Sequence, residues 1–544
     1  MNFKKRLFSL LVIMSLILSL SGCFFTTSTD KTHTTISSTI STTTTNSVTN
    51  SKSRTTSVIT NSTTTQTTTI TDSSTLLNYY KENNINHTYH DLGLDSDYYL
   101  WHYLPSIGEV NILVIPVTIK GYEKNANVIV KSDIEKTFFG KSTDTYWESV
   151  SSFYYKSSYG KLSIKGTVTD WMGPVSTTID KMTNEIKIDS EDVVQSTSNF
   201  LKEKGINTLD YDSDFDGFID LVWYVYSAPN YDNDGSLSND FWAFTTSSDS
   251  NVANTVSPTI NNYCWASYDF MYAWEKSSLI HMNDGVDAHT YIHETGHALG
   301  LDDYYNADLD ISSDDDSVQK VDMMSANVGD HNAFSKLALG WVNPYIVYGN
   351  SEIILKDFES TGECVVLPLS LWDSNAFGEY LIFEYYTPTL LNLKDKNGYE
   401  NNLSTPSGSG IKVYHVDARL AYENNEDKID PITGEYPRTF LDKYSDFKKD
   451  LGSGLFVAYS NTPSYATVKT KKGESEKYLI SIVDRKEGYF DTYKKDLDNN
   501  TLFVSGNTLD TSTIKYHMNK SLNYKITFAK DTSDNMVLTF SIKQ

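Results

Sequence analysis

Cysteine is scarce in this sequence, which contains three, Cys23, Cys264 and Cys364, among 544 residues. Three are too few for the disulfide framework of many secreted domains, so the folded parts must be stable through packing alone. Basic residues are also few, because 45 Lys and Arg face 70 Asp and Glu, which gives a formal net charge of -25. A chain this acidic is repelled by phosphate backbones, so no nucleic-acid partner is expected.

Long apolar runs are missing apart from one near the N-terminus. Basic residues precede an apolar run over residues 7–20, which is too short to span a bilayer comfortably. The run ends in Leu20-Ser-Gly-Cys23, which resembles the signal of bacterial lipoproteins. We predict a lipoprotein signal peptide over residues 1–22 and an acylated Cys23 that anchors the chain on the extracellular face of the cell membrane. The alternative is an ordinary signal peptide cut near Gly22.

The remaining sequence divides into three parts. Residues 23–78 are mostly Ser and Thr and have almost nothing to bury, so they predict a disordered tether. Residues 79–345 mix helical and strand patterns, including a β-branched apolar strand at 110–119. Residues 346–544 contain short alternating strands separated by turn residues, which predict an all-β, sandwich-like region. The length allows two folded units with full-sized cores.

One segment carries a metal-binding pattern. Residues 287–299 have helical spacing and no proline, and they place His293 and His297 four residues apart on one helix face. Two imidazoles at this spacing reach one Zn²⁺ at about 2.0 to 2.1 Å, and Glu294 points at a water on the metal. The sequence therefore predicts one catalytic zinc with Glu294 as the general base.

The pattern continues beyond the helix. Gly300 suits the left-handed position that ends a helix, and Asp303 follows as a third possible ligand. His289 lies one turn before His293, but its use as a ligand would leave Gly300 without a role. We interpret His289 as a surface residue or as a residue behind the ligands.

These residues resemble those of the immune inhibitor A family of secreted bacterial zinc metallopeptidases. The similarity covers the helix "HETGHALGLDDYY", the upstream segments "SSFYYKSSYGKL" and "DYDSDFDGFIDLVWY", and the downstream segment "MMSANVGDHNAFSKLALGW". The resemblance spans roughly residues 110–344 and is looser in the β-rich remainder. It implies an α+β, metzincin-like zinc-peptidase domain.

The resemblance also implies roles for individual residues. His293, His297 and Asp303 match the zinc ligands of the family, and Glu294 matches its general base. Met324 matches the methionine of the turn beneath the metal, with Met323 as the alternative. Asp302 stands where the family has proline, so a second carboxylate lies beside Asp303 and either one is a possible ligand. The oxyanion-stabilising residue is left open among Tyr304, Tyr305 and His331.

A second metal pattern lies upstream. It places carboxylates at positions 1, 3, 5 and 9 and a glycine at position 6 of a calcium loop, through Asp212, Asp214, Asp216, Asp220 and Gly217. Position 12 is Trp223, so the loop is not a complete EF-hand. We predict a structural Ca²⁺ here, with a solvated acidic turn as the alternative.

Together these features predict a cell-surface zinc endopeptidase that hydrolyses peptide bonds of extracellular proteins or glycoproteins by a zinc-activated water. Two alternatives remain. One is an inactive adhesin or binding lipoprotein on a metallopeptidase fold, which the intact Glu294 disfavours. The other is a zinc-capturing lipoprotein, which would need neither Glu294 nor a long β-rich region.

Overall fold

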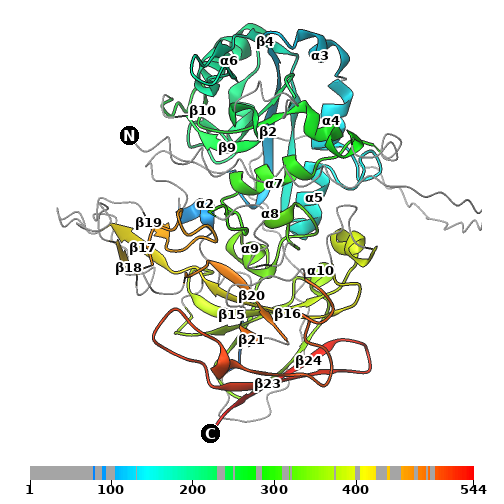
Figure 1. Cartoon of the computed structure of the whole chain (residues 1–544), viewed down its shortest axis with the longest axis vertical. Helices are drawn as coiled ribbons and strands as arrows, with labels where there is room; N and C mark the ends of the chain where they lie inside the picture. Colours follow the sequence, from blue (N-terminus) through cyan, green and yellow to red (C-terminus); the bar gives the residue numbers. More distant parts are fainter. Residues whose placement is uncertain are drawn as a thin grey trace, which may run out of the picture.

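The computed structural model describes residues 77–79, 88–92, 104–129, 131–229, 239–248, 251–276, 285–308, 318, 321–372, 375–397, 405–423, 438–441, 455–470, 476–485, 488–489 and 497–544. The predicted signal peptide, Cys23 and the Ser/Thr-rich segment up to residue 76 lie outside the described residues. No helix in the described part is both long and apolar enough to cross a membrane. The structure is mixed α/β with several sheets, and its β-rich part forms the lower half of Figure 1.

A six-stranded sheet lies at the centre of the upper half, in the order β3-β2-β8-β11-β9, with β4 also paired to β2. Neighbouring strands are parallel except for the edge strand β9, which is antiparallel to β11. The predicted strand at residues 110–119 is confirmed as part of β2. The strands are β2 Gly108–Ile119, β3 Leu162–Val168, β4 Met172–Val175, β8 Val222–Tyr226, β9 Phe244–Ser247 and β11 Asn262–Ser267.

Helices cover both faces of this sheet because alternate residues of β2 enter two different cores. Leu113 and Ile115 pack with α6, whereas Ile112 and Val114 pack with α4, α5 and α7. These helices are α4 Lys131–Phe139, α5 Val150–Ser157, α6 Ser190–Lys204 and α7 His289–Ala298. The shorter elements are α2 Tyr89–Leu92, α3 Glu123–Val128, β5 Thr178–Ile179, β6 Ile186–Lys187, η2 Thr208–Tyr211, β7 Phe218–Ile219, η3 Asn239–Phe241, β10 Thr259–Ile260, η4 Tyr268–Lys276, α8 Met323–Ala326 and α9 Ala333–Ala338.

The β-rich half contains a seven-stranded sheet in the order β1-β12-β14-β15-β16-β20-β21. Its strands are β1 Leu77–Tyr79, β12 Tyr345–Val347, β14 Cys364–Pro368, β15 Glu379–Tyr386, β16 Gly410–Asp417, β20 Ile480–Asp484 and β21 Gly488–Tyr489. A four-stranded sheet comprises β13 Ser351–Leu355, β24 Met536–Ile542, β23 Tyr524–Lys530 and β22 Thr508–Asp510. The other elements are β17 Leu420–Glu423, β18 Arg438–Phe440, β19 Leu455–Val457, α10 Phe358–Thr361, η6 Leu390–Asn397 and η9 Thr511–Thr513.

The seven-stranded sheet is covered on both faces. Leu381 and Phe383 of β15 enter a core shared with the four-stranded sheet, where the rings of Phe383 and Phe540 lie 5.6 Å apart. Ile382, between them, enters the core that also contains side chains of α5 and α7. β15 and β16 are therefore buried at every position, unlike strands with one solvated face. The predicted short strands are confirmed, and one continuous core joins them to the upper half.

Candidate metal centre

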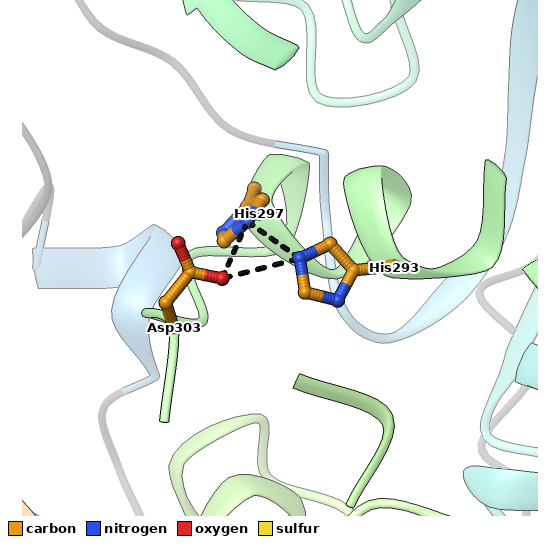
Figure 2. Close-up of side chains that lie close together, drawn as sticks. All are labelled: His293, His297 and Asp303. Carbon is orange, nitrogen blue, oxygen red and sulfur yellow. Dashed lines mark hydrogen bonds and ion pairs between the residues drawn. The ribbon is translucent and has the colours of Figure 1, made fainter. Parts of the chain in front are cut away.

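The end of helix α7 brings the third predicted ligand back to the two histidines. Gly300 has a φ of 97°, and its backbone N–H donates to the His297 carbonyl at 2.8 Å. This backbone conformation strains any residue with a Cβ, so the predicted role of Gly300 as the turning point is confirmed. Figure 2 shows the Asp303 carboxylate pointing at His293 and His297.

The three predicted ligand atoms form a small triangle (Figure 2). Asp303 Oδ1 lies 3.1 Å from His293 Nε2 and 3.3 Å from His297 Nε2, and the two nitrogens lie 3.2 Å apart. A tetrahedral zinc with bonds of about 2.0 to 2.1 Å separates neighbouring ligand atoms by about 3.3 to 3.4 Å. The triangle therefore has close to the dimensions that one such ion requires.

Hydrogen bonds on the far side of each ring determine the tautomers. His293 Nδ1 lies 2.8 Å from the Met323 carbonyl oxygen, and His297 Nδ1 lies 2.8 Å from the Leu301 carbonyl oxygen. A carbonyl oxygen only accepts, so each Nδ1 carries a proton and each Nε2 is the ring nitrogen that faces Asp303. Asp303 Oδ1 is buried and faces both Nε2 atoms. These three atoms are the ones that a cation at this position would bind.

The methionine turn supports α7 through both of its methionines. Met323 supplies the carbonyl that orients His293, and the Met324 side chain packs against Gly296 of α7. A Cβ at Gly296 would collide with the Met324 sulfur, so glycine permits the close approach. Met324 thus packs against the helix that carries the two histidines, and Met323 acts through its backbone.

The structure separates the two neighbouring carboxylates. The Asp302 side chain hydrogen-bonds Ser460, and its Oδ1 accepts the backbone N–H of Asp303 at 3.0 Å. Burial raises the pKa of Asp302 to about 6, although the bond from Ser460 opposes this change. Burial also acts on Asp303, but the adjacent His297 and His293 hold its pKa below the ordinary value. Asp303, and not Asp302, joins the two histidines.

Glu294 is buried next to the edge strand β9. The Thr245 hydroxyl of β9 lies 3.1 Å from Glu294 Oε2 and 2.8 Å from the Glu294 carbonyl oxygen. Burial raises the pKa of Glu294, and the nearby His297 and His293 partly offset this effect. A carboxylate with a raised pKa is suited to accept and return protons near neutral pH.

Cys264 and Cys364 are also buried, and neither forms a disulfide.

The other candidates near the site have separate surroundings. The Tyr304 hydroxyl is buried against Ser335 Oγ at 2.6 Å. The Tyr305 hydroxyl hydrogen-bonds the Asp303 side chain, which places it at the ligand group. The ring of His331 packs between Phe153, Tyr154 and Trp341, and burial lowers its pKa to about 3. Of the three oxyanion candidates, Tyr305 is the one in contact with a predicted ligand.

His289 is not a member of the ligand group. Its Nδ1 lies 2.5 Å from Asp287 Oδ1, and its ring stacks on Trp147 with centroids 4.7 Å apart. Only 7% of His289 is exposed, so it is not the surface histidine that was one of the two expectations. The predicted exclusion of His289 from the ligands agrees with this arrangement.

Three of the four predicted calcium ligands are close together. Carboxylate oxygens of Asp212, Asp214 and Asp216 lie within 4.8 Å of one another. Asp220 instead accepts the Ser213 backbone N–H at 3.0 Å and the Ser213 hydroxyl at 2.6 Å. The predicted fourth carboxylate therefore closes the turn and does not join the others.

A further group of possible ligands was not predicted from the sequence. Glu379 of β15, Asp417 of β16 and His517 lie together in the β-rich half, with ligand atoms within 4.8 Å. Their separation along the chain leaves no local spacing that would have revealed them.

Comparison of the sequence with models of known protein families and with curated proteins gave no match.

Proposed function

We propose that this protein is a metzincin-like zinc endopeptidase that hydrolyses peptide bonds of extracellular proteins or glycoproteins. The observation that carries the proposal is the triangle of ligand atoms from His293, His297 and Asp303, with the buried Glu294 next to it. A zinc ion held there would supply Lewis acidity and would make a water acidic enough to react near neutral pH.

The chain's own residues then have distinct tasks. The Met323 and Leu301 carbonyls hold the imidazole rings in the ligand tautomer. Glu294 takes the proton from the attacking water and returns it to the leaving amine, so one carboxylate acts as base and then as acid. Thr245 holds Glu294 in place during both transfers.

The position of β9 suits an extended substrate. β9 ends the order of the six-stranded sheet, and its Thr245 touches Glu294. A peptide that adds to the β9 edge as a further strand would bring its backbone next to Glu294. Such pairing reads the peptide backbone, which is the chemical group that a peptidase must hold.

The proposal extends to location and to a second ion. The Leu20-Ser-Gly-Cys23 motif supports a lipid anchor on the extracellular side of the membrane. Asp212, Asp214 and Asp216 support a structural calcium ion that takes no part in the chemistry.

The decisive variant is Glu294→Gln, with Glu352→Gln in β13 as the matched control. We expect Glu294→Gln to keep its zinc and to lose kcat for casein by about 10²-fold to 10⁴-fold, because it cannot carry the proton. The control should keep both zinc and activity. Casein hydrolysis at the wild-type rate by zinc-loaded Glu294→Gln would contradict the mechanism. A wild-type protein that binds zinc but cleaves neither casein nor mucin would favour the zinc-capture or adhesin alternative.

A further inference from the structure

Two segments that are far apart in the sequence are joined beside the ligand triangle. The first is the ligand loop, residues 302–308, which contains Asp303. The second is the clamp segment, residues 460–464, which belongs to the β-rich half. The contacts are a side-chain hydrogen bond from Ser460 to Asp302, Asn461 Nδ2 to the Tyr304 carbonyl at 2.9 Å, Thr462 Oγ1 to the Tyr305 carbonyl at 3.3 Å, the Ala307 N–H to Thr462 Oγ1 at 3.0 Å, and the Ser464 N–H to Asp308 Oδ2 at 2.6 Å.

Asn461 is almost fully buried, with 1% exposed. Its Nδ2 also donates to the Ile480 carbonyl at 3.0 Å, and its Oδ1 accepts the Ile480 N–H at 3.0 Å. Ile480 belongs to β20 of the seven-stranded sheet. One buried amide therefore connects the sheet to the residue that follows Asp303.

Tyr304 is held from both sides. Its N–H donates to the Met324 carbonyl at 2.8 Å, and its carbonyl accepts from Asn461. The methionine turn, which orients His293, thus fixes one side of the Tyr304 backbone, and the β-rich half fixes the other. Because Asp303 is the preceding residue, the position of its carboxylate depends on both contacts.

The residues just before the clamp segment pack against a buried group of charged side chains. Tyr459, which precedes it, lies with its ring 5.5 Å from that of His517, and the Ala458 N–H donates to the Arg419 carbonyl at 2.8 Å. His517 and Arg419 both bind Asp417 of β16. The group around Asp417 therefore contacts the residues that lead into the clamp segment and helps to hold it in place.

We propose that the β-rich half is a structural component of the metal centre, and that Asn461 is a positioning residue that holds Asp303 in ligand geometry. This inference rests on the proposed zinc site. Residues that orient metal ligands from behind typically change metal affinity by about 10-fold to 100-fold. The role of the β-rich half is then to keep the third ligand in place, which a zinc site on an isolated helix could not do for itself.

The test uses the full chain with Asn461→Asp, which keeps the acceptor for the Ile480 N–H and loses the donor to the Tyr304 and Ile480 carbonyls. We expect zinc affinity, measured by competition with a chromogenic chelator, to fall about 10-fold to 100-fold. Amide hydrogen exchange in residues 302–308 of the zinc-free protein should become faster. The matched control is Thr511→Val, which removes buried hydrogen bonds to Tyr524 in the four-stranded sheet and should leave both readouts unchanged.

The outcomes separate this inference from the proposed function. If the wild type binds zinc and Asn461→Asp binds it equally well, the positioning role is wrong. The role is also wrong if Thr511→Val weakens zinc binding as much as Asn461→Asp does, because general destabilisation would then explain both. If the wild type binds no zinc but Asn461→Asp still accelerates exchange in the ligand loop, the proposed function fails and the contact between the two segments stands.

Discussion

Two groups of histidine and carboxylate side chains in this protein have similar compositions and different hydrogen bonding. In the first, the Nδ1 protons of His293 and His297 are used by backbone carbonyls, so both Nε2 atoms face the Asp303 carboxylate. In the second, hydrogen-bond donors already occupy the carboxylates. Proximity of ligand residues therefore does not by itself predict a metal centre, because hydrogen bonds from other residues can already satisfy the carboxylates.

The second group is satisfied by its neighbours. Arg419 donates to both Asp417 oxygens at 2.7 Å, and the His517 ring lies 2.9 Å from Asp417 Oδ2. Glu379 accepts the Met518 N–H at 2.8 Å and lies 3.0 Å from the His415 ring. A metal ion there would have to displace an arginine and break these bonds. We therefore interpret this group as a buried ion-pair network.

The largest expected difference between the two groups is the effect of an Asp→Asn substitution on zinc binding. Asp303→Asn should weaken zinc binding by at least about 100-fold, because it changes a ligand and residues behind ligands already account for 10-fold to 100-fold effects. Asp417→Asn changes no predicted ligand and acts on zinc only through the clamp segment, so at saturating zinc its content should stay at one per chain. Asp302→Ala, the nearest control, should also keep its zinc. The zinc content of the three purified variants is the measurement. Full zinc in Asp303→Asn would show that Asp303 is not the third ligand.

The second group should matter for stability in a pH-dependent way. Burial opposes ionisation of Asp417, but hydrogen bonds from Arg419 and His517 lower its pKa to about 2. A lowered pKa means that the ionised form stabilises the fold above the ordinary pKa near 4, and that this contribution is lost as the pH falls towards 2.

Removal of one partner from a buried pair costs about 3 to 5 kcal/mol. Asp417→Asn should therefore unfold at lower urea concentration than the wild type at pH 7, and the difference should shrink between pH 4 and pH 2. A difference that stays constant across this range would mean that the charge of Asp417 does not stabilise the fold.

The predicted calcium loop gives the test with the smallest expected effect, which is on thermal stability. Burial and the neighbouring Asp216 and Asp214 raise the pKa of Asp212, although backbone N–H groups of the loop donate to Asp212 and Asp216. A cation would further reduce the repulsion among these carboxylates. Calcium at a hundredfold excess over its Kd should add about 2.7 kcal/mol of stability. The melting temperature of the wild type and of Asp220→Asn should rise with calcium. The triple Asn variant at Asp212, Asp214 and Asp216 should lose this rise in melting temperature. If the variant shows the full rise, the prediction of a calcium site is wrong.

Local patterns predicted much of the centre. The spacing of His293 and His297 and the turn at Gly300 depend on residues within a few positions of one another, so the sequence contains the information directly. The choice between Asp302 and Asp303 does not, because Ser460 in the β-rich half binds Asp302. Asp220 has the right spacing for a calcium ligand, but the neighbouring Ser213 satisfies it.

The fold shows the same limit. The strand at residues 110–119 has a long β-branched run and was predicted from it. Complete burial of β15 and β16 was not predicted, because it depends on which elements cover each face of the sheet. Contacts between distant segments, such as Asn461 with Tyr304, have no counterpart in periodicity or composition.

The most direct test of the zinc centre is anomalous diffraction at the zinc edge from crystals of the purified full chain. The account predicts one peak, about 2.0 to 2.2 Å from His293 Nε2, His297 Nε2 and an Asp303 oxygen. It predicts no peak between Glu379, Asp417 and His517. A peak at the second group, or no peak at the first in protein that contains zinc, would contradict the account.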